Sequence, residues 1–80
     1  MEDYKNLSGL SNVVAYEIGD DHITVKFDEN PAFTYTTYKY SYDSAGKENV
    51  ETMKDLAQEG WGLNSFINAK VRKLYEKATK

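Results

Sequence analysis

Four tyrosines in the middle of the chain are the residues most able to form a binding surface. Tyr35, Tyr38, Tyr40 and Tyr42 fall at near-alternating positions in the segment 33–43. Alternation of aromatic and polar residues is typical of a β-strand with two unlike faces. Rings on an exposed sheet face can stack on unpaired bases, whereas rings on a covered face close the core. Both interpretations stay open, and residue parity favours the core for Tyr38 and Tyr42.

The basic residues gather near the end of the chain. Residues 46–80 hold seven Lys or Arg against five Asp or Glu, whereas residues 1–45 hold three against eight. Contacts with an anion are therefore expected from the C-terminal half, although the cations there equally suit the end of a helix. The net charge of −3 argues against a dedicated duplex-DNA binder. The candidate cations are Lys39, Lys70, Arg72, Lys73 and Lys77.

Trp61 and His22 are the other side chains that could contact a ligand. Trp61 stands between Gly60 and Gly62, where it is either a contact hot spot or a plug between helix and sheet. His22 has no cysteine or second histidine with which to share a metal. The chain also has no phosphate-binding glycine loop and no Ser-containing elbow motif. We therefore expect no catalytic residue, no metal site and no cofactor.

Three strands are predicted in the first half of the chain: Leu10 to Ile18, His22 to Phe27, and Phe33 to Asp43. The aromatic positions of the third strand change parity between Tyr35 and Tyr38. An extra residue near Thr36-Thr37, forming a β-bulge, would return its aromatic residues to one face and turn Lys39 and Ser41 to water.

Two helices are predicted in the second half. The first runs from Lys47 to Glu59, with Ser44 as a cap and Gly60 at its C-terminal end. The second runs from Ser65 to about Lys77, with Asn64 as its cap. Its apolar stripe consists of Phe66, Ile67, Val71, Leu74 and Tyr75.

Together these elements predict one α+β domain at 10–80, preceded by a flexible tail at 1–9. Its fold is a three-stranded antiparallel meander followed by two helices packed on one face. The chain has no cysteine, no signal-peptide pattern and no apolar run long enough for a membrane span. We therefore expect a cytoplasmic protein with no membrane association.

The chain resembles the KTSC domain family, named for its occurrence at the C-terminus of some lysyl-tRNA synthetases and found also as free-standing bacterial proteins. The resemblance covers residues 10–75, with Ala45-Gly46 where the family has Val-Pro. The matching segments are Tyr40-Ser41-Tyr42, Gly60-Trp61-Gly62-Leu63-Asn64, Ile67 and Tyr75. A second register, through Phe33-Thr34-Tyr35, fits the family's Tyr-x-Tyr motif about as well. The resemblance implies a small bacterial α+β module, for which RNA binding has been suggested.

Two functions are consistent with these observations. The first is contact with RNA or single-stranded nucleic acid through Tyr38, Lys39, Tyr40, Tyr42, Trp61, Lys70, Arg72, Lys73 and Lys77. The second is protein–protein interaction or self-association through the wet face or outer edge of the sheet. A small enzyme would require a polar pocket around His22 and an acidic partner. The sequence leaves the ligand and the oligomeric state open.

Overall fold

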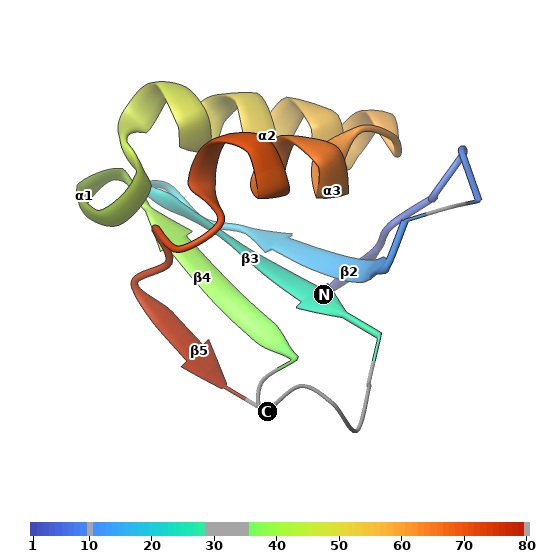
Figure 1. The fold of residues 1–80 in the computed structure, drawn as a ribbon, viewed down its shortest axis with the longest axis horizontal. Coiled ribbons are helices and arrows are strands. Elements are labelled where there is room, and N and C mark those ends of the chain that lie inside the picture. The colour runs from blue at the N-terminus through green and yellow to red at the C-terminus, as the bar shows by residue number, and fades with distance from the viewer. Residues whose placement is uncertain (10, 29–35, 80) are drawn as a thin grey trace.

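The computed structural model describes residues 1–9, 11–28 and 36–79 (Figure 1). Strands come first along the chain, helices follow, and a short strand comes after the helices. The elements are β1 (Glu2–Asp3), β2 (Val13–Ile18), β3 (His22–Phe27), β4 (Thr37–Ser41), α1 (Tyr42–Ala45), α2 (Lys47–Glu59), α3 (Leu63–Phe66), the π-helix η1 (Ile67–Val71) and β5 (Lys77–Thr79).

The strands form one antiparallel sheet in the order β1-β2-β3-β4-β5, and the helices lie on one face of it (Figure 1). The predicted α+β class and the antiparallel meander are therefore confirmed. The prediction of three strands is wrong, because β1 and β5 extend the sheet at its two edges. These strands have two and three residues, which is too short for an alternating pattern to be visible in the sequence.

The first residues of the chain pack against the domain. Glu2 pairs with Tyr16 in the sheet, and the Tyr4 amide donates to the Val14 carbonyl at 3.0 Å. Tyr4 is 6% exposed and belongs to the core. Its hydroxyl accepts a 3.4 Å hydrogen bond from the Leu63 amide. A loose tail is therefore the wrong description of residues 2–4.

The central hairpin, formed by β2 and β3, agrees closely with the prediction. Strand β3 has the predicted bounds, and the Gly19 amide donates to the His22 carbonyl at 3.0 Å across the turn. Strand β2 begins at Val13, three residues later than predicted, and Leu10 lies outside the described residues. The irregularity in this hairpin falls between Val13 and Ala15 of β2.

Strand β4 is shorter than predicted. Its ladder with β3 is regular from Thr37 to Ser41, while Phe33, Tyr35 and the rest of the segment 29–35 lie outside the described residues. The β-bulge proposed for Thr36-Thr37 is not seen within this ladder. The strand stops because Ser41 and Ser44 form a capping box that starts α1. Ser41 is consequently buried, and the expectation that it faces water is wrong.

Helix α2 has the predicted bounds and the predicted core face. Val50, Met53 and Ala57 are buried at helical spacing. Gly60 ends the helix in the left-handed conformation, and its amide donates to the Leu56 carbonyl at 2.9 Å. The predicted cap is wrong, since Gly46 precedes α2 and Ser44 belongs to α1.

The second helical segment begins earlier and ends earlier than predicted. Gly62, rather than Asn64, precedes α3, and the helical segment ends at Val71 after the wide π-turn of η1. Leu74 is 43% exposed and Tyr75 is 38% exposed, so neither continues the buried stripe. Lys77, which we expected at the end of this helix, begins β5 instead.

The core lies between the helices and the sheet. Its side chains are Tyr4, Val13, Tyr16, Ile23, Val25, Tyr40, Ala45, Val50, Met53, Ala57, Leu63, Ile67 and Val71. In the described part of the chain, no helix is both long and apolar enough to cross a membrane.

Candidate nucleic-acid interface

Strand β4 directs Tyr38 and Tyr40 toward the helices. Tyr40 pairs with Ile23 and Tyr38 with Val25, so these four side chains share the sheet face that the helices cover. Tyr40 is 2% exposed and belongs to the core. Burial raises the pKa of its hydroxyl strongly, with smaller contributions from Tyr38 and Tyr75. Tyr40 was predicted as a stacking residue, and this prediction is wrong because no base can reach its ring.

Tyr42 lies apart from the other tyrosines at the start of α1. Its hydroxyl donates a 2.7 Å hydrogen bond to Glu51 Oε2, and this bond raises the pKa of Tyr42. The ammonium groups of Lys47 and Lys54 lie 5.8 and 5.5 Å from its ring centroid. The ring is thus already engaged by two cations of its own chain.

Tyr38 and Tyr75 form the aromatic pair that remains near the surface. Their ring centroids are 4.9 Å apart at an interplanar angle of 67°. Phe27 also packs edge-on against Tyr38, with the ring centroids 5.7 Å apart. Tyr38 therefore contacts two rings, while Tyr75 keeps 38% of its surface exposed. Of the two, Tyr75 has the more accessible ring.

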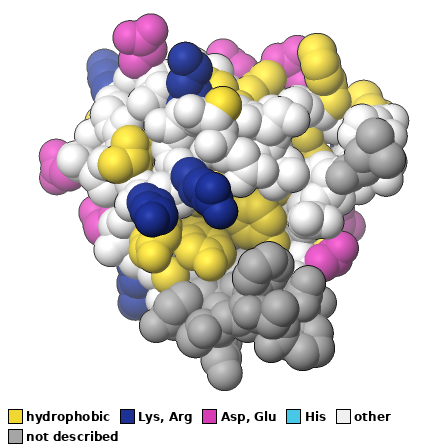
Figure 2. Space-filling view, in the orientation of Figure 1, with side chains coloured by type: hydrophobic (Ala, Val, Ile, Leu, Met, Phe, Trp, Pro, Cys, Tyr) yellow, Lys and Arg dark blue, Asp and Glu magenta, His cyan; other side chains and the backbone are white. Residues whose placement is uncertain are grey.

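Two exposed cations precede Tyr75 in the segment after η1. Arg72 and Lys73 are exposed and follow directly after the buried Val71. The Glu76 amide donates to the Lys39 carbonyl at 2.7 Å and so fixes the segment to β4. On the face seen in Figure 1, basic side chains border a hydrophobic patch (Figure 2). We call Tyr38, Arg72, Lys73 and Tyr75 the C-terminal corner.

Lys39 and Lys77 do not belong to the C-terminal corner but lie on the other face of the sheet. They are opposite each other in the β4–β5 ladder, on the face that the helices leave open. Lys39 Nζ lies 3.2 Å from Glu76 Oε2. The Ser41 hydroxyl and the Lys39 ammonium lower the pKa of Glu76, so this carboxylate stays charged. Lys39 thus already has an acidic partner, and the Asp21 carboxylate also interacts electrostatically with Lys39 and Glu76.

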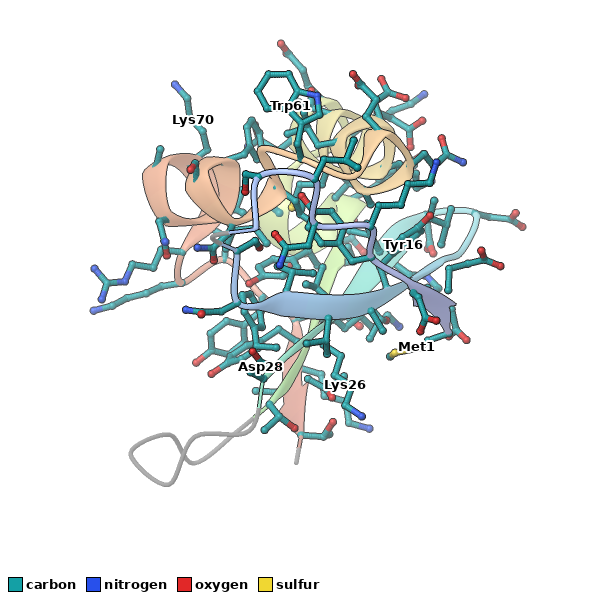
Figure 3. The ribbon with its side chains drawn as sticks, turned by 90° about the vertical axis from the view of Figure 1, so that its right-hand side faces the viewer. Met1, Tyr16, Lys26, Asp28, Trp61 and Lys70 are labelled. Carbon is teal, nitrogen blue, oxygen red and sulfur yellow. The ribbon has the colours of Figure 1, made fainter. Side chains whose placement is uncertain are left out.

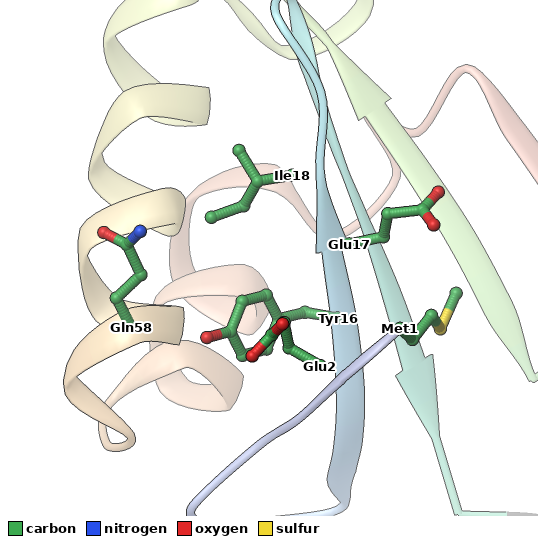
Figure 4. A pocket seen from close by; sticks show the side chains of 6 residues that line it. All are labelled: Met1, Glu2, Tyr16, Glu17, Ile18 and Gln58. Atoms are coloured by element: carbon green, nitrogen blue, oxygen red, sulfur yellow. The ribbon is translucent and has the colours of Figure 1, made fainter.

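Trp61 and Lys70 do not join the C-terminal corner. Trp61 is 56% exposed in the turn after α2, and Lys70 is exposed on η1. Figure 3 shows both on the helical layer, away from the sheet residues Lys26 and Asp28. The alternative of Trp61 as a plug between helix and sheet is therefore wrong.

Tyr75 has a role that the helical pattern of the sequence does not predict. We assigned this residue to the buried stripe of a helix extending to Lys77, whereas it faces Tyr38 from an irregular segment. The basic run Arg72-Lys73 directly before Leu74-Tyr75 is a pattern in the sequence that could have indicated a surface segment.

The described residues hold no group of three or more His, Cys, Asp or Glu side chains that could bind a metal ion. His22 Nδ1 lies 3.0 Å from Asp21 Oδ1 and so has a local partner.

Comparison with known proteins found no matching family model, no matching curated protein and no matching solved structure. The resemblance to the KTSC family stays a prediction.

Proposed function

We propose that this protein is a non-enzymatic binding module whose C-terminal corner contacts RNA or single-stranded DNA. The observation that carries the proposal is the exposed ring of Tyr75, held 4.9 Å from Tyr38 and preceded by the exposed cations Arg72 and Lys73. Aromatic rings beside basic side chains suit a nucleic-acid strand with unpaired bases. The bases can stack on the rings, and the basic side chains can donate hydrogen bonds to the phosphates.

The edge of the sheet extends this surface. A strand that stacks on Tyr75 and crosses β5 would meet Lys77 and Lys39 on the open face. Two acidic residues of the N-terminal half, Glu2 and Asp3, lie on β1 at the opposite edge of the sheet, whereas Asp21 lies within electrostatic reach of Lys39. The positive charge of the proposed surface therefore rests chiefly on the exposed Arg72 and Lys73.

The test is an NMR titration of labelled protein with oligouridylate and oligothymidylate at low and high salt. Shifts should cluster on Tyr38, Arg72, Lys73 and Tyr75 and weaken at high salt. With about three phosphate contacts, the logarithm of affinity should fall with the logarithm of salt with a slope of about −2. Absence of saturable shifts at low salt would reject the proposal.

Two pairs of variants make the test specific. Tyr75→Leu keeps an apolar contact with Tyr38 but removes a stacking ring, and should weaken binding by about 5-fold to 150-fold. Trp61→Leu is its matched aromatic control and should leave binding unchanged. Lys73→Ala should weaken binding and flatten the salt dependence, whereas Lys70→Ala should not. Equal effects of Lys70→Ala and Lys73→Ala would show that only diffuse charge is involved.

Protein–protein interaction is the second candidate, and one observation favours it. Leu7 is 68% exposed and Trp61 is 56% exposed. The Leu7 amide donates to the Gly60 carbonyl at 2.8 Å, which places the two apolar side chains in neighbouring segments. Exposed aromatic and aliphatic side chains together are typical of contact surfaces. Sedimentation of the wild type and of Trp61→Ser across a concentration series tests self-association; a monomer at all concentrations would contradict it.

A further inference from the structure

The last described segment of the chain lies on the outside of the domain. Residues 72–79, which we call the strap, leave the helical layer after Val71 and return along the outer edge of β4 (Figure 1). Every strap residue is exposed except Ala78, which is half-buried. Among the described residues, the buried core includes no side chain from the strap. Burial in the core therefore does not hold the strap in place.

The strap interacts with the sheet along β4. Its three strand residues, Lys77–Thr79, pair with three consecutive residues of β4. The Glu76 amide donates to the Lys39 carbonyl at 2.7 Å, and the side chains of the same two residues are 3.2 Å apart. The Tyr75 ring packs against Tyr38. Because these contacts follow a single strand, the strap can detach as one unit while the core stays packed.

The other edge strand, β1, is anchored more firmly. It is followed directly by Tyr4, which is buried in the core. In the β4–β5 ladder, Lys39 and Lys77 are directly opposite each other, and like charges in such a pair are destabilising. The carboxylates of Glu76 and Asp21 offset part of this repulsion at Lys39. Of the two edges of the sheet, the β5 edge is therefore the one that opens more easily.

The strap covers an edge that fits a particular strand. When the strap detaches, the outer side of β4 presents unpaired backbone groups with Tyr38 beside them, and such an edge accepts another strand. The structure shows which strand fits: the chain's own Lys77–Thr79, with the ring of Tyr75 before it. A second copy of the chain carries the same strand and the same ring.

We propose that two copies of this protein exchange straps. Each strap pairs with β4 of the other copy in the register seen within one chain, and residues 72–76, which lie outside the helices and strands, form the hinge. The exchange is reciprocal, so it closes as a two-fold dimer. Both states contain the same ladder, so protein concentration decides between them. The strap of the same chain competes at an effective concentration on the order of 1 mM.

The experiment identifies which copy supplies each strap. The chain has no cysteine, so Lys39→Cys combined with Lys77→Cys places one pair of thiols at opposite positions of the β4–β5 ladder. The full-length variant is equilibrated and oxidised at about 10 μM and about 2 mM, below and above the effective concentration of the strap. A non-reducing denaturing gel then separates chains linked internally from linked dimers. Dimers should rise from a few per cent to about half of the chains or more.

A second cysteine pair is the matched control. Glu17→Cys combined with Thr24→Cys joins opposite positions of the β2–β3 hairpin, whose strands are neighbours in sequence. This pair should link within one chain at both concentrations. Equal dimer fractions for the two pairs would overturn the proposal, and so would internal linkage of the first pair at about 2 mM. Neither measurement involves nucleic acid, so the result is independent of the proposed RNA or DNA contact.

A shorter hinge gives another readout. Deletion of Lys73 and Leu74 keeps the parity of the strand that follows, and a shortened hinge favours exchange between copies over return within one copy. The deletion variant should sediment as a dimer at about 10 μM, below the effective concentration of the strap. Lys73→Ala combined with Leu74→Ala keeps the hinge length and should stay monomeric. A folded but monomeric deletion variant would contradict the exchange; if circular dichroism shows it unfolded, the cysteine pairs decide.

Discussion

Alkaline pH should destabilise this protein through one side chain in particular, Tyr40. The ring is 2% exposed, and its burial raises the pKa of the hydroxyl far above the usual value of about 10. The unfolded chain therefore releases this proton near pH 10, while the folded chain retains it to higher pH. The stabilising contribution is complete below pH 10 and is lost as the pH rises toward the folded-state pKa.

The size of the effect follows from one proton. When the folded state binds one more proton than the unfolded state, the free energy of unfolding falls by about 1.4 kcal/mol per pH unit. Between pH 8 and 11.5 the loss from Tyr40 is about 2 kcal/mol. A domain of this length has a total stability of roughly 4–12 kcal/mol, so the change is easily measured.

The assay is urea unfolding of the wild type and of Tyr40→Phe, followed by far-UV circular dichroism from pH 8 to 11.5. Raised pKa values at Tyr4, through burial, and at Tyr42, through its hydrogen bond to Glu51, affect both proteins alike. The wild type should therefore lose about 2 kcal/mol more than Tyr40→Phe. The same decline in wild type and Tyr40→Phe would refute the burial of this hydroxyl.

Three further substitutions test the packing and the turns. Met53→Ala should lower the free energy of unfolding in urea by about 2–5 kcal/mol, since Met53 is fully buried, whereas Met1→Ala should not change it. Gly60→Ala should lower the melting temperature more than Gly9→Ala. Both glycines have positive φ, but only at Gly60 would a Cβ meet a neighbour, 2.6 Å from the Lys5 Cβ; equal shifts would contradict this. Ser41→Ala removes one half of the capping box, so it should cost about 1 kcal/mol and speed amide exchange at Ser44; unchanged exchange would show that the cap is dispensable.

The sequence correctly predicted the elements that have a long hydrophobic pattern and characteristic residues at their ends. Strand β3 keeps strict alternation over its full length, and α2 keeps its buried stripe up to a glycine that adopts the left-handed conformation. The second helix was overextended because Leu74 and Tyr75 continue the helical spacing of Ile67 and Val71. The wide turn of η1 and the end of the helix at Val71 are not visible in that spacing.

The candidate site depended on information that only the folded chain contains. The sequence identified the basic residues Arg72 and Lys73, which the structure leaves exposed. It could not show which tyrosine stays accessible, because that depends on which sheet face the helices cover. Tyr40 is buried under them, whereas Tyr75 reaches the surface beside Tyr38.

The return of the chain from η1 to β5 has a consequence for how the domain is made. Strand β4 pairs on one side with β3, which is close in sequence, and on the other with β5, about forty residues later. During synthesis β4 is therefore an edge strand until the segment 77–79 has left the ribosome. A protease that removed this segment would restore that edge, with Tyr38 beside it. The shortened domain could then accept a strand from a neighbouring molecule in place of its own.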